Sequence, residues 1–144
     1  LAAGERNNTI WEFREYCVLP GMAFLKPDIG LAGGFTHVKK IAALAEGFHI
    51  KMAPHHFLGP ITLMALTHIA TATPNWDVNE FNIETGTFKE DIVSNVVEVQ
   101  DGYFIPPETP GLGIDINVEE MLKNPYEAGP GEGSRRPDGG LVLG

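Results

Sequence analysis

The sequence predicts an α/β fold in which short parallel strands alternate with helices. Short apolar runs recur along the first 85 residues, and helical stretches with apolar residues every third or fourth position separate them. In addition, Glu5, Asp28, His55 and Glu80 stand where these apolar runs end. Strands that alternate with helices form βαβ units, whose strands are parallel.

The first helix is expected to begin at Thr9, because Thr9 and Glu12 have the spacing of a capping box. Pro20-Gly21 ends it. Its apolar face carries Ile10, Phe13 and Cys17. Before it, the segment 1–5 is typical of the end of a strand that begins upstream, and Leu1 is not a start methionine. The sequence therefore indicates a truncated chain.

The second unit begins with the apolar run 22–25, which is typical of a buried parallel strand and ends in Lys26-Pro27-Asp28. Gly30, Gly33 and Gly34 form a loop before the second helix, and Gly47 is predicted to cap its C-terminus. The apolar stripe of this helix consists of Val38, Ile41, Ala42 and Ala45. The glycines also suggest a phosphate-binding loop, but this signal is weak because no Lys-Ser/Thr follows.

The third unit has a predicted strand over 48–53, which Pro54-His55-His56 ends. Gly59-Pro60 opens a helix that is apolar on nearly all sides, so we expect it to be well buried. Pro74 closes this helix, and 76–81 is a further extended stretch.

The pattern changes after residue 84, so we predict two segments, 1–84 with the βα units and 85–144 as a C-terminal extension. Asp101-Gly102 between 96–99 and 103–105 predicts a β-hairpin. Residues 118–123 are expected to form a short helix. The tail from Pro125 onward is rich in glycine, proline and charge, which is typical of a surface wrap or partial disorder.

The composition argues against several classes of function. The 144 residues suffice for one core, and the net charge of −9 with ten Lys+Arg argues against nucleic acid. No apolar run approaches a membrane span of about 20 residues. The single cysteine, Cys17, cannot form an internal disulfide, which favours the cytoplasm. Cys17 is a nucleophile or a packing residue, and we favour packing.

The four polar residues at the run ends are separated by 23, 27 and 25 residues, about one strand–helix unit each. They should meet at one edge, because parallel strands end on the same side. A carboxylate there suits Mg²⁺, and a histidine near neutral pKa suits a general base. An adjacent aspartate can fix the tautomer of that histidine. A carboxyl kept protonated by burial or by a neighbouring anion can stabilise an oxyanion.

Each candidate has an alternative. Asp28 is also suited to a turn, and Glu5 to a surface pair with the adjacent arginine. One residue of His55-His56 should be structural, since neighbours on an extended chain point to opposite faces; the pair also suggests a transition-metal site. Glu80 is the weakest candidate by itself. The remaining histidines, which are expected to pack or lie at the surface, are His37, His49 and His68.

Four motifs resemble the mandelate racemase branch of the enolase superfamily, and most closely its galactonate dehydratase-like acid-sugar dehydratases. They are AAGER at 2–6, KPDIGLAGG at 26–34, APHHFLGP at 53–60 and ATPN at 72–75. The likeness continues through PGLG at 110–113 to RPDG at 136–139. It implies the C-terminal part of a (β/α)₈ barrel, namely its last three βα units.

The resemblance also implies roles for the four residues. Glu5 resembles the third carboxylate ligand of Mg²⁺, His55 the base with Asp28 as its orienter, and Glu80 the acid at the enolate oxygen. The implied reaction removes the proton beside the carboxylate of a sugar acid and then water, giving a 2-keto-3-deoxy acid. The acid that assists departure of the hydroxyl is not identified in this chain.

A complete barrel needs roughly 200 residues or more. We therefore expect this chain to be an incomplete enzyme, inactive without the N-terminal part of a homo-oligomeric protein. Two alternatives stay open: a racemase, epimerase or lactone cycloisomerase of the same superfamily, and a non-catalytic fragment that docks on an N-terminal partner. Nothing in the chain identifies the sugar acid.

Overall fold

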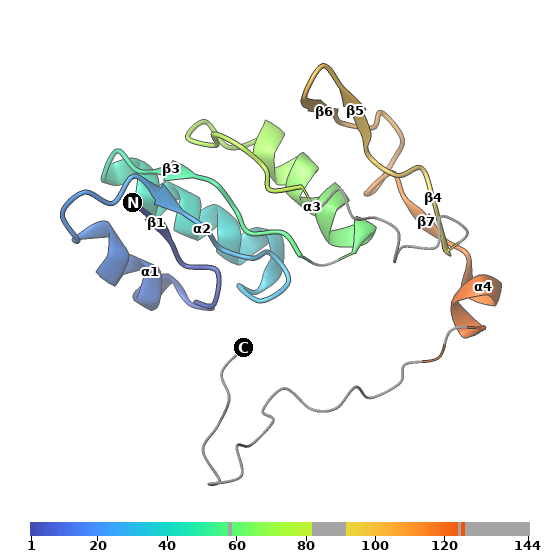
Figure 1. Cartoon of the computed structure of the whole chain (residues 1–144), viewed down its shortest axis with the longest axis horizontal. Helices are drawn as coiled ribbons and strands as arrows, with labels where there is room; N and C mark the ends of the chain where they lie inside the picture. The colour runs from blue at the N-terminus through green and yellow to red at the C-terminus, as the bar shows by residue number, and fades with distance from the viewer. Residues whose placement is uncertain (58, 82–91, 124, 126–144) are drawn as a thin grey trace, which may run out of the picture.

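A parallel sheet of three short strands organises the first part of the molecule (Figure 1). The computed structural model describes residues 1–57, 59–81, 92–123 and 125. The strands are β1 (Ala2–Ala3), β2 (Phe24–Leu25) and β3 (Lys51–Met52), in the order β1-β2-β3. The predicted parallel βαβ arrangement is therefore confirmed, with strands shorter than their apolar runs.

The register of the sheet is set by Leu25, which pairs with Ala3 on one side and with Met52 on the other. Beyond β3, the predicted stretch 76–81 joins the sheet only through a parallel bridge between Met52 and Trp76. All these strand pairings are parallel. The C-terminal ends of the strands therefore lie at one edge of the sheet.

Helix α1 (Ile10–Cys17) begins with the capping box that the sequence predicts. The Glu12 amide donates to Thr9 Oγ1 at 3.4 Å, and the Thr9 amide donates to Glu12 Oε2 at 2.7 Å. Phe13 and Cys17 are buried on the inner face of the helix. Burial raises the pKa of the Cys17 thiol, which favours packing over nucleophilic chemistry.

Helix α2 (Gly34–Gly47) buries the predicted stripe of Val38, Ile41, Ala42 and Ala45. The prediction that Gly47 caps it was wrong. Gly47 is the last helical residue, and His49 instead takes the left-handed conformation, with φ 58°. The Ile50 amide donates to Ala45 O at 2.9 Å and the His49 amide to Glu46 O at 3.0 Å, which is a Schellman motif. The backbone bonds and the burial of Ile50 fix this end without a glycine.

Helix α3 (Pro60–Thr71) starts at Gly59 with proline in its first turn, as the sequence predicts. Most of it is buried, although Ile61 keeps 39% of its surface exposed. Its buried residues are Leu63, Met64, Ala65, Leu66, Thr67 and Ile69. None of the helices among the described residues has the length and apolar character needed to cross a membrane.

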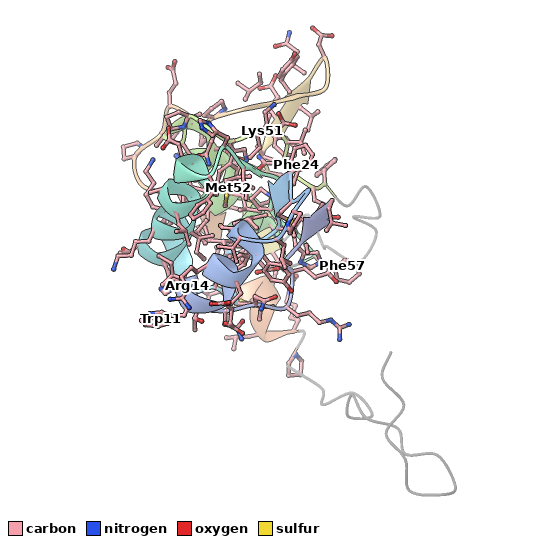
Figure 2. All side chains as sticks on the ribbon, turned by 90° about the vertical axis from the view of Figure 1, so that its left-hand side faces the viewer. Trp11, Arg14, Phe24, Lys51, Met52 and Phe57 are labelled. Carbon is pink, nitrogen blue, oxygen red and sulfur yellow. The ribbon has the colours of Figure 1, made fainter. Side chains whose placement is uncertain are left out.

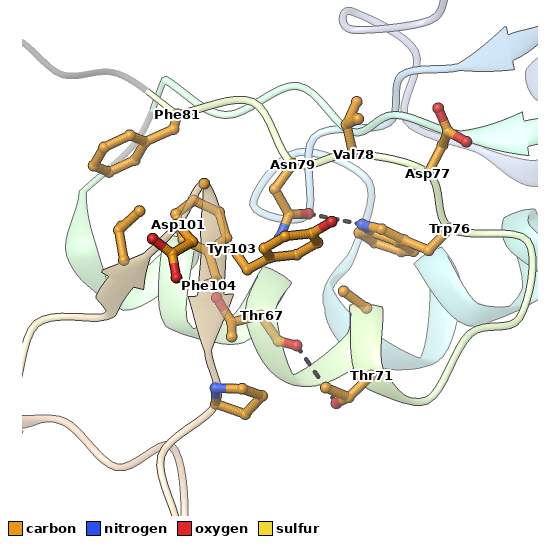
Figure 3. Close-up of a pocket in the computed structure, with 14 residues that line it drawn as sticks. Thr67, Thr71, Trp76, Asp77, Val78, Asn79, Phe81, Asp101, Tyr103 and Phe104 are labelled. Carbon is orange, nitrogen blue, oxygen red and sulfur yellow. Dashed lines mark hydrogen bonds between the residues drawn. The ribbon is translucent and has the colours of Figure 1, made fainter.

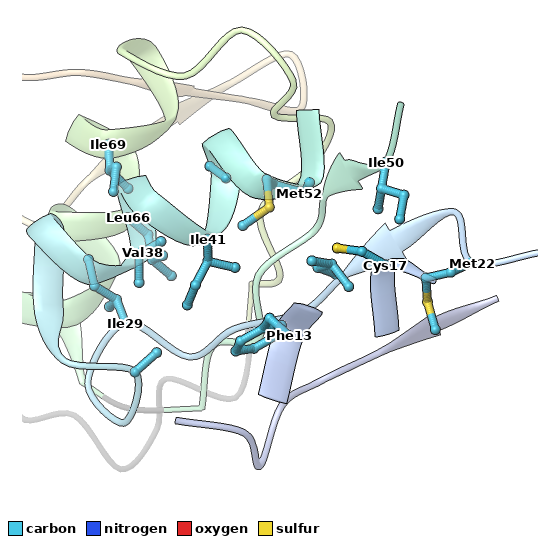
Figure 4. Packing of buried hydrophobic residues seen from close by; sticks show 14 of the residues in the cluster. Phe13, Cys17, Met22, Ile29, Val38, Ile41, Ile50, Met52, Leu66 and Ile69 are labelled. Carbon is cyan, nitrogen blue, oxygen red and sulfur yellow. The ribbon is translucent and has the colours of Figure 1, made fainter. Parts of the chain in front are cut away.

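The three helices share one core with the sheet (Figure 4). Phe13, Leu25, Ile41 and Met52 are fully buried there. Leu25 alternates along the chain with Phe24 and Lys26, and Met52 is followed by Ala53. Phe24, Lys26 and Ala53 line a hollow of about 320 Å³. Because side chains alternate along a strand, the helices cover one face of the sheet and this hollow lies on the other.

The C-terminal region has smaller, antiparallel pairings. Strand β4 (Val93–Ser94) pairs with β7 (Asp115–Ile116), and β5 (Glu98–Gln100) pairs with β6 (Tyr103–Ile105). Asp101 and Gly102 between β5 and β6 have φ 51° and 83°, as a two-residue type I′ turn requires. The predicted hairpin is thus confirmed.

Helix α4 (Val118–Leu122) confirms the predicted short helix. The predicted boundary between residues 84 and 85 lies outside the described residues, as does the predicted tail except for its first residue, Pro125.

Two of the remaining histidines bind backbone. The Ile10 amide donates to His37 Nε2 at 2.9 Å, which joins the starts of α1 and α2. His68 Nε2 lies 3.1 Å from Leu112 O and links α3 to the C-terminal region. Together with His49 in the Schellman motif, these contacts confirm the predicted packing or surface roles.

Candidate functional site

Asp28 and His55 meet at the C-terminal edge of the sheet, just beyond β2 and β3. Asp28 Oδ2 lies 3.0 Å from His55 Nδ1, although the residues are 27 positions apart in the sequence. The parallel register of β2 and β3 brings them together. The sequence-based prediction that these strand-end residues converge is therefore correct for this pair.

Asp28 is a turn residue and also a partner for histidine. Its Oδ1 accepts the Gly30 amide at 2.8 Å and the Leu31 amide at 3.2 Å, while Oδ2 faces His55. Asp28 as a whole is only 2% exposed. Because both oxygens act as acceptors, His55 Nδ1 carries the proton in this hydrogen bond. The lone pair of neutral His55 is then on Nε2.

Glu80 approaches the other side of the His55 ring. Its Oε2 lies 4.0 Å from His55 Nε2 and accepts the His56 amide at 3.0 Å. Its Oε1 is 3.2 Å from Lys26 Nζ. Three of the four predicted residues thus form one cluster, with His55 between two carboxylates.

The ionisation of Glu80 differs from the sequence-based expectation. Burial raises its pKa, but the hydrogen bonds from the His56 amide and Lys26, and the charges of Lys26 and His55, outweigh burial and lower the pKa. Glu80 is therefore a carboxylate at neutral pH. This direction differs from the expectation of a carboxyl kept protonated by a neighbouring anion or by burial, because Lys26 and the His56 amide stabilise the anion.

His56 points away from this cluster and has a structural environment. It is 5% exposed, and its Nε2 lies 3.3 Å from Gly59 O and 3.2 Å from Thr62 Oγ1 at the start of α3. Burial lowers its pKa and favours the neutral ring. The prediction that one residue of the pair is structural is confirmed for His56.

Glu5 lies beyond β1, exposed at the same edge of the sheet, and forms no hydrogen bond or ion pair within the described part of the chain. It is the one predicted residue that does not contact the cluster. Its carboxylate is a suitable donor for Mg²⁺, but this ion needs about six oxygen ligands. Among the described residues, no group of three or more His, Cys, Asp or Glu side chains could hold a metal. These residues alone therefore do not fit a complete magnesium or transition-metal site.

Sequence reasoning missed two further neighbours, Lys26 and Phe57. Lys26 ends the apolar run of β2, so its place beside the strand-end carboxyls was the available signal. Phe57 stacks on His55 with ring centroids 6.4 Å apart and an interplanar angle of 17°. Its side chain is 72% exposed and projects on the side opposite Trp11 and Arg14 of α1 (Figure 2). Phe57 is therefore an exposed aromatic neighbour of the His55 ring.

A larger hollow of about 650 Å³ lies between the end of α3, the segment 76–81 and the hairpin (Figure 3). Trp76, Asn79 and Tyr103 line it, and Trp76 Nε1 donates to Asn79 Oδ1 at 2.7 Å. None of Glu5, Asp28, His55 and Glu80 lines this hollow. The candidate site residues therefore lie at the edge of the sheet, outside this hollow.

The chain is similar to known proteins over most of its length. The sequence profile of the enolase C-terminal domain-like family matches residues 1–121. D-galactonate dehydratase from Ralstonia pickettii (strain 12J) is 36% identical over 134 residues, which cover 89% of this chain and 35% of the relative. The chain thus spans about a third of the length of this curated relative.

Two solved structures are similar over most of the chain. A mandelate racemase/muconate lactonizing enzyme-like protein from Roseovarius sp. TM1035 has a TM-score of 0.78 and 34% identity, covering 99% of this chain and 33% of that chain. The 3,6-anhydro-D-galactonate cycloisomerase from Zobellia galactanivorans has a TM-score of 0.76 and 25% identity, covering 85% and 34%.

Proposed function

The chain belongs to the enolase C-terminal domain-like family, and from this premise we propose that it carries the proton-abstracting residues of an acid-sugar dehydratase. The observation that carries the proposal is the 3.0 Å contact of Asp28 Oδ2 with His55 Nδ1 at the ends of two parallel strands. It leaves His55 Nε2 as the basic atom. The relatives named D-galactonate dehydratase support a sugar acid as substrate.

In the proposed reaction, His55 Nε2 takes the proton from the carbon beside the substrate carboxylate. Asp28 holds Nδ1–H and stabilises the imidazolium that forms, as an aspartate does in hydrolase triads. The hydroxyl on the next carbon then takes a proton from a general acid that is not among these residues and leaves as water. The resulting enol tautomerises to a 2-keto-3-deoxy acid, and His55 releases its proton to complete the cycle. Glu80, as a carboxylate 4.0 Å from Nε2, gives the imidazolium a second anionic partner.

We propose Mg²⁺ as the cofactor of the complete enzyme, with Glu5 as one of its carboxylate ligands. A bound Mg²⁺ stabilises negative charge on the substrate carboxylate. The described residues offer no complete metal site, so every step above is assigned to side chains.

The proposal also includes the rest of a (β/α)₈ barrel, in which residues 1–84 supply the last three βα units and 85–144 a C-terminal extension. The hollow on the open face of the sheet supports this, since parallel sheets are normally covered on both faces. In this proposal the 144-residue chain alone is inactive, and it works with an N-terminal portion of the length found in its relatives.

A related reaction is the second candidate, because a cycloisomerase is among the similar solved structures. Racemases, epimerases and cycloisomerases of this superfamily resemble dehydratases in their His–Asp pair. They differ in the fate of the intermediate after proton removal. Product analysis therefore separates the two candidates.

The test is a screen of sugar acids with Mg²⁺, using the polypeptide that carries this chain at the length of its relatives and detecting 2-keto acids. His55→Asn should lower kcat by about 10²–10⁴-fold, because it removes the general base. Glu5→Gln should raise the Mg²⁺ concentration needed for activity. His68→Gln, outside the site, is the control.

Product formation by His55→Asn at the unsubstituted rate would contradict the proposal. Exchange of the α-proton with solvent deuterium, lost in His55→Asn and without a 2-keto product, would favour the second candidate.

A further inference from the structure

We propose that Lys26 is a positioning residue for Glu80, holding one oxygen of its carboxylate so that the other faces His55. This inference rests on the proposed function, in which Glu80 is the second anionic partner of His55. Lys26 stands two residues before Asp28, on the open face of the sheet.

The two oxygens of Glu80 have separate partners. Oε1 is 3.2 Å from Lys26 Nζ, whereas Oε2 accepts the His56 amide and lies 4.0 Å from His55 Nε2. A carboxylate held at one oxygen only can rotate about its last bond. Contacts at both oxygens fix this rotation and leave Oε2 directed at the base.

The contact is long-range in sequence and partly shielded in space. Lys26 and Glu80 are 54 positions apart, and Lys26 reaches across the end of β3 to meet Glu80. The Lys26 side chain is 24% exposed and that of Glu80 42%. A pair with this exposure interacts more strongly than a fully exposed pair but is still screened by solvent.

The groups that face Glu80 from the neighbouring elements are few. Lys26 comes from β2, and the His55 ring and the His56 amide follow β3. Asp77, on the segment of Glu80 itself, lines the same hollow. The Lys26 ammonium forms an ion pair with Glu80, and its charge together with that of His55 favours the ionised carboxyl.

The chain contains a matched control for this pair. Lys51 on β3 forms an ion pair with Asp77, which also joins a lysine of the sheet to a carboxylate of the last extended segment. Neither Lys51 nor this ion pair touches Glu80. A change at Lys51 therefore removes a similar charge from the same face without removing the contact that we assign to Lys26.

The test is a carbon-13 NMR titration of the Glu80 carboxyl in the 144-residue chain, with the resonance assigned by its loss in Glu80→Gln. Lys26→Met keeps most of the apolar stem and should raise the titration midpoint by about half a unit to one unit. Lys26→Arg should retain the low midpoint, and Lys51→Met should leave it unchanged.

An unchanged midpoint in Lys26→Met would overturn the inference, and so would an equal shift in Lys51→Met. The titration needs neither substrate nor metal. Failure of the sugar-acid screen would therefore leave the Lys26 result standing, and an unchanged midpoint would leave the dehydratase proposal standing.

Discussion

The parallel-sheet region, residues 1–81, and the C-terminal region, residues 92–123, use strands in opposite ways. The strands of the first region are two residues long and yet place Leu25 and Met52 in a continuous core. In the second region the hairpin strands are longer, but Val99 and Tyr103 remain 47% and 73% exposed. Val93 is the one buried hydrophobic residue of the described part after residue 81.

The difference shows that strand length does not decide where the core forms. Helices α1, α2 and α3 cover the short parallel strands, whereas the hairpin strands, among the described elements, pack mainly on each other. Burial of apolar surface is the main favourable term in folding. We therefore expect the first region to supply nearly all the stability of the chain, and it also holds every residue of the candidate site.

The largest expected effect tests this division of stability. Phe13→Ala removes a ring with no exposed surface and should lower the free energy of unfolding by about 3–5 kcal/mol. Tyr103→Ala, in the exposed hairpin, should change it by less than about 0.5 kcal/mol. Urea unfolding of the chain, followed by circular dichroism, measures both. Equal losses would mean that the hairpin belongs to the same folding unit.

Sequence reasoning worked best where the determining contacts are local. The capping box of Thr9 and Glu12 spans four residues, and the buried stripe of α2 repeats with the helical period. The prediction that Gly47 caps α2 was wrong, because the residue that takes the left-handed conformation after a helix depends on how the following chain packs. Burial of Ile50 places that position at His49.

In the candidate site, the sequence predicted which side chains meet better than it predicted their ionisation states. Parallel strands end at one edge whatever their exact register, so the meeting of Asp28 and His55 could be predicted. The contact of Lys26 with Glu80 depends on which side chains share a face across three strands. Without that contact, the direction of the Glu80 pKa shift could not be predicted.

The next prediction compares the loss of stability when a glycine in each region is replaced by alanine, and these losses should be smaller. Gly4 has φ 118°, and a Cβ added there would lie 2.4 Å from Phe13 Cε1. Gly4→Ala should therefore cost about 2–4 kcal/mol, from left-handed strain and overpacking. Gly102 in the hairpin has φ 83° but nothing within 4 Å, so Gly102→Ala should cost about 1–2 kcal/mol. Thermal unfolding compares the two variants, and a larger loss for Gly102→Ala would contradict the division.

The smallest expected effect is a pH dependence that belongs to the first region. Burial of His56 lowers its pKa in the folded chain, so between pH 6.5 and the folded pKa the unfolded chain binds more protons. The contribution of neutral His56 is present in full above pH 6.5 and is lost as the pH falls through that window. The free energy of unfolding should therefore decrease on acidification below pH 6.5.

The variant that checks this origin is His56→Gln, which keeps a polar side chain beside Thr62 but cannot titrate. Its unfolding free energy should fall less steeply below pH 6.5 than that of the unsubstituted chain. His68→Gln, which alters the contact of α3 with Leu112 O in the C-terminal region, should keep the original slope. If His68→Gln flattens the slope instead, acid sensitivity resides in the junction between the two regions, and the core is not its source.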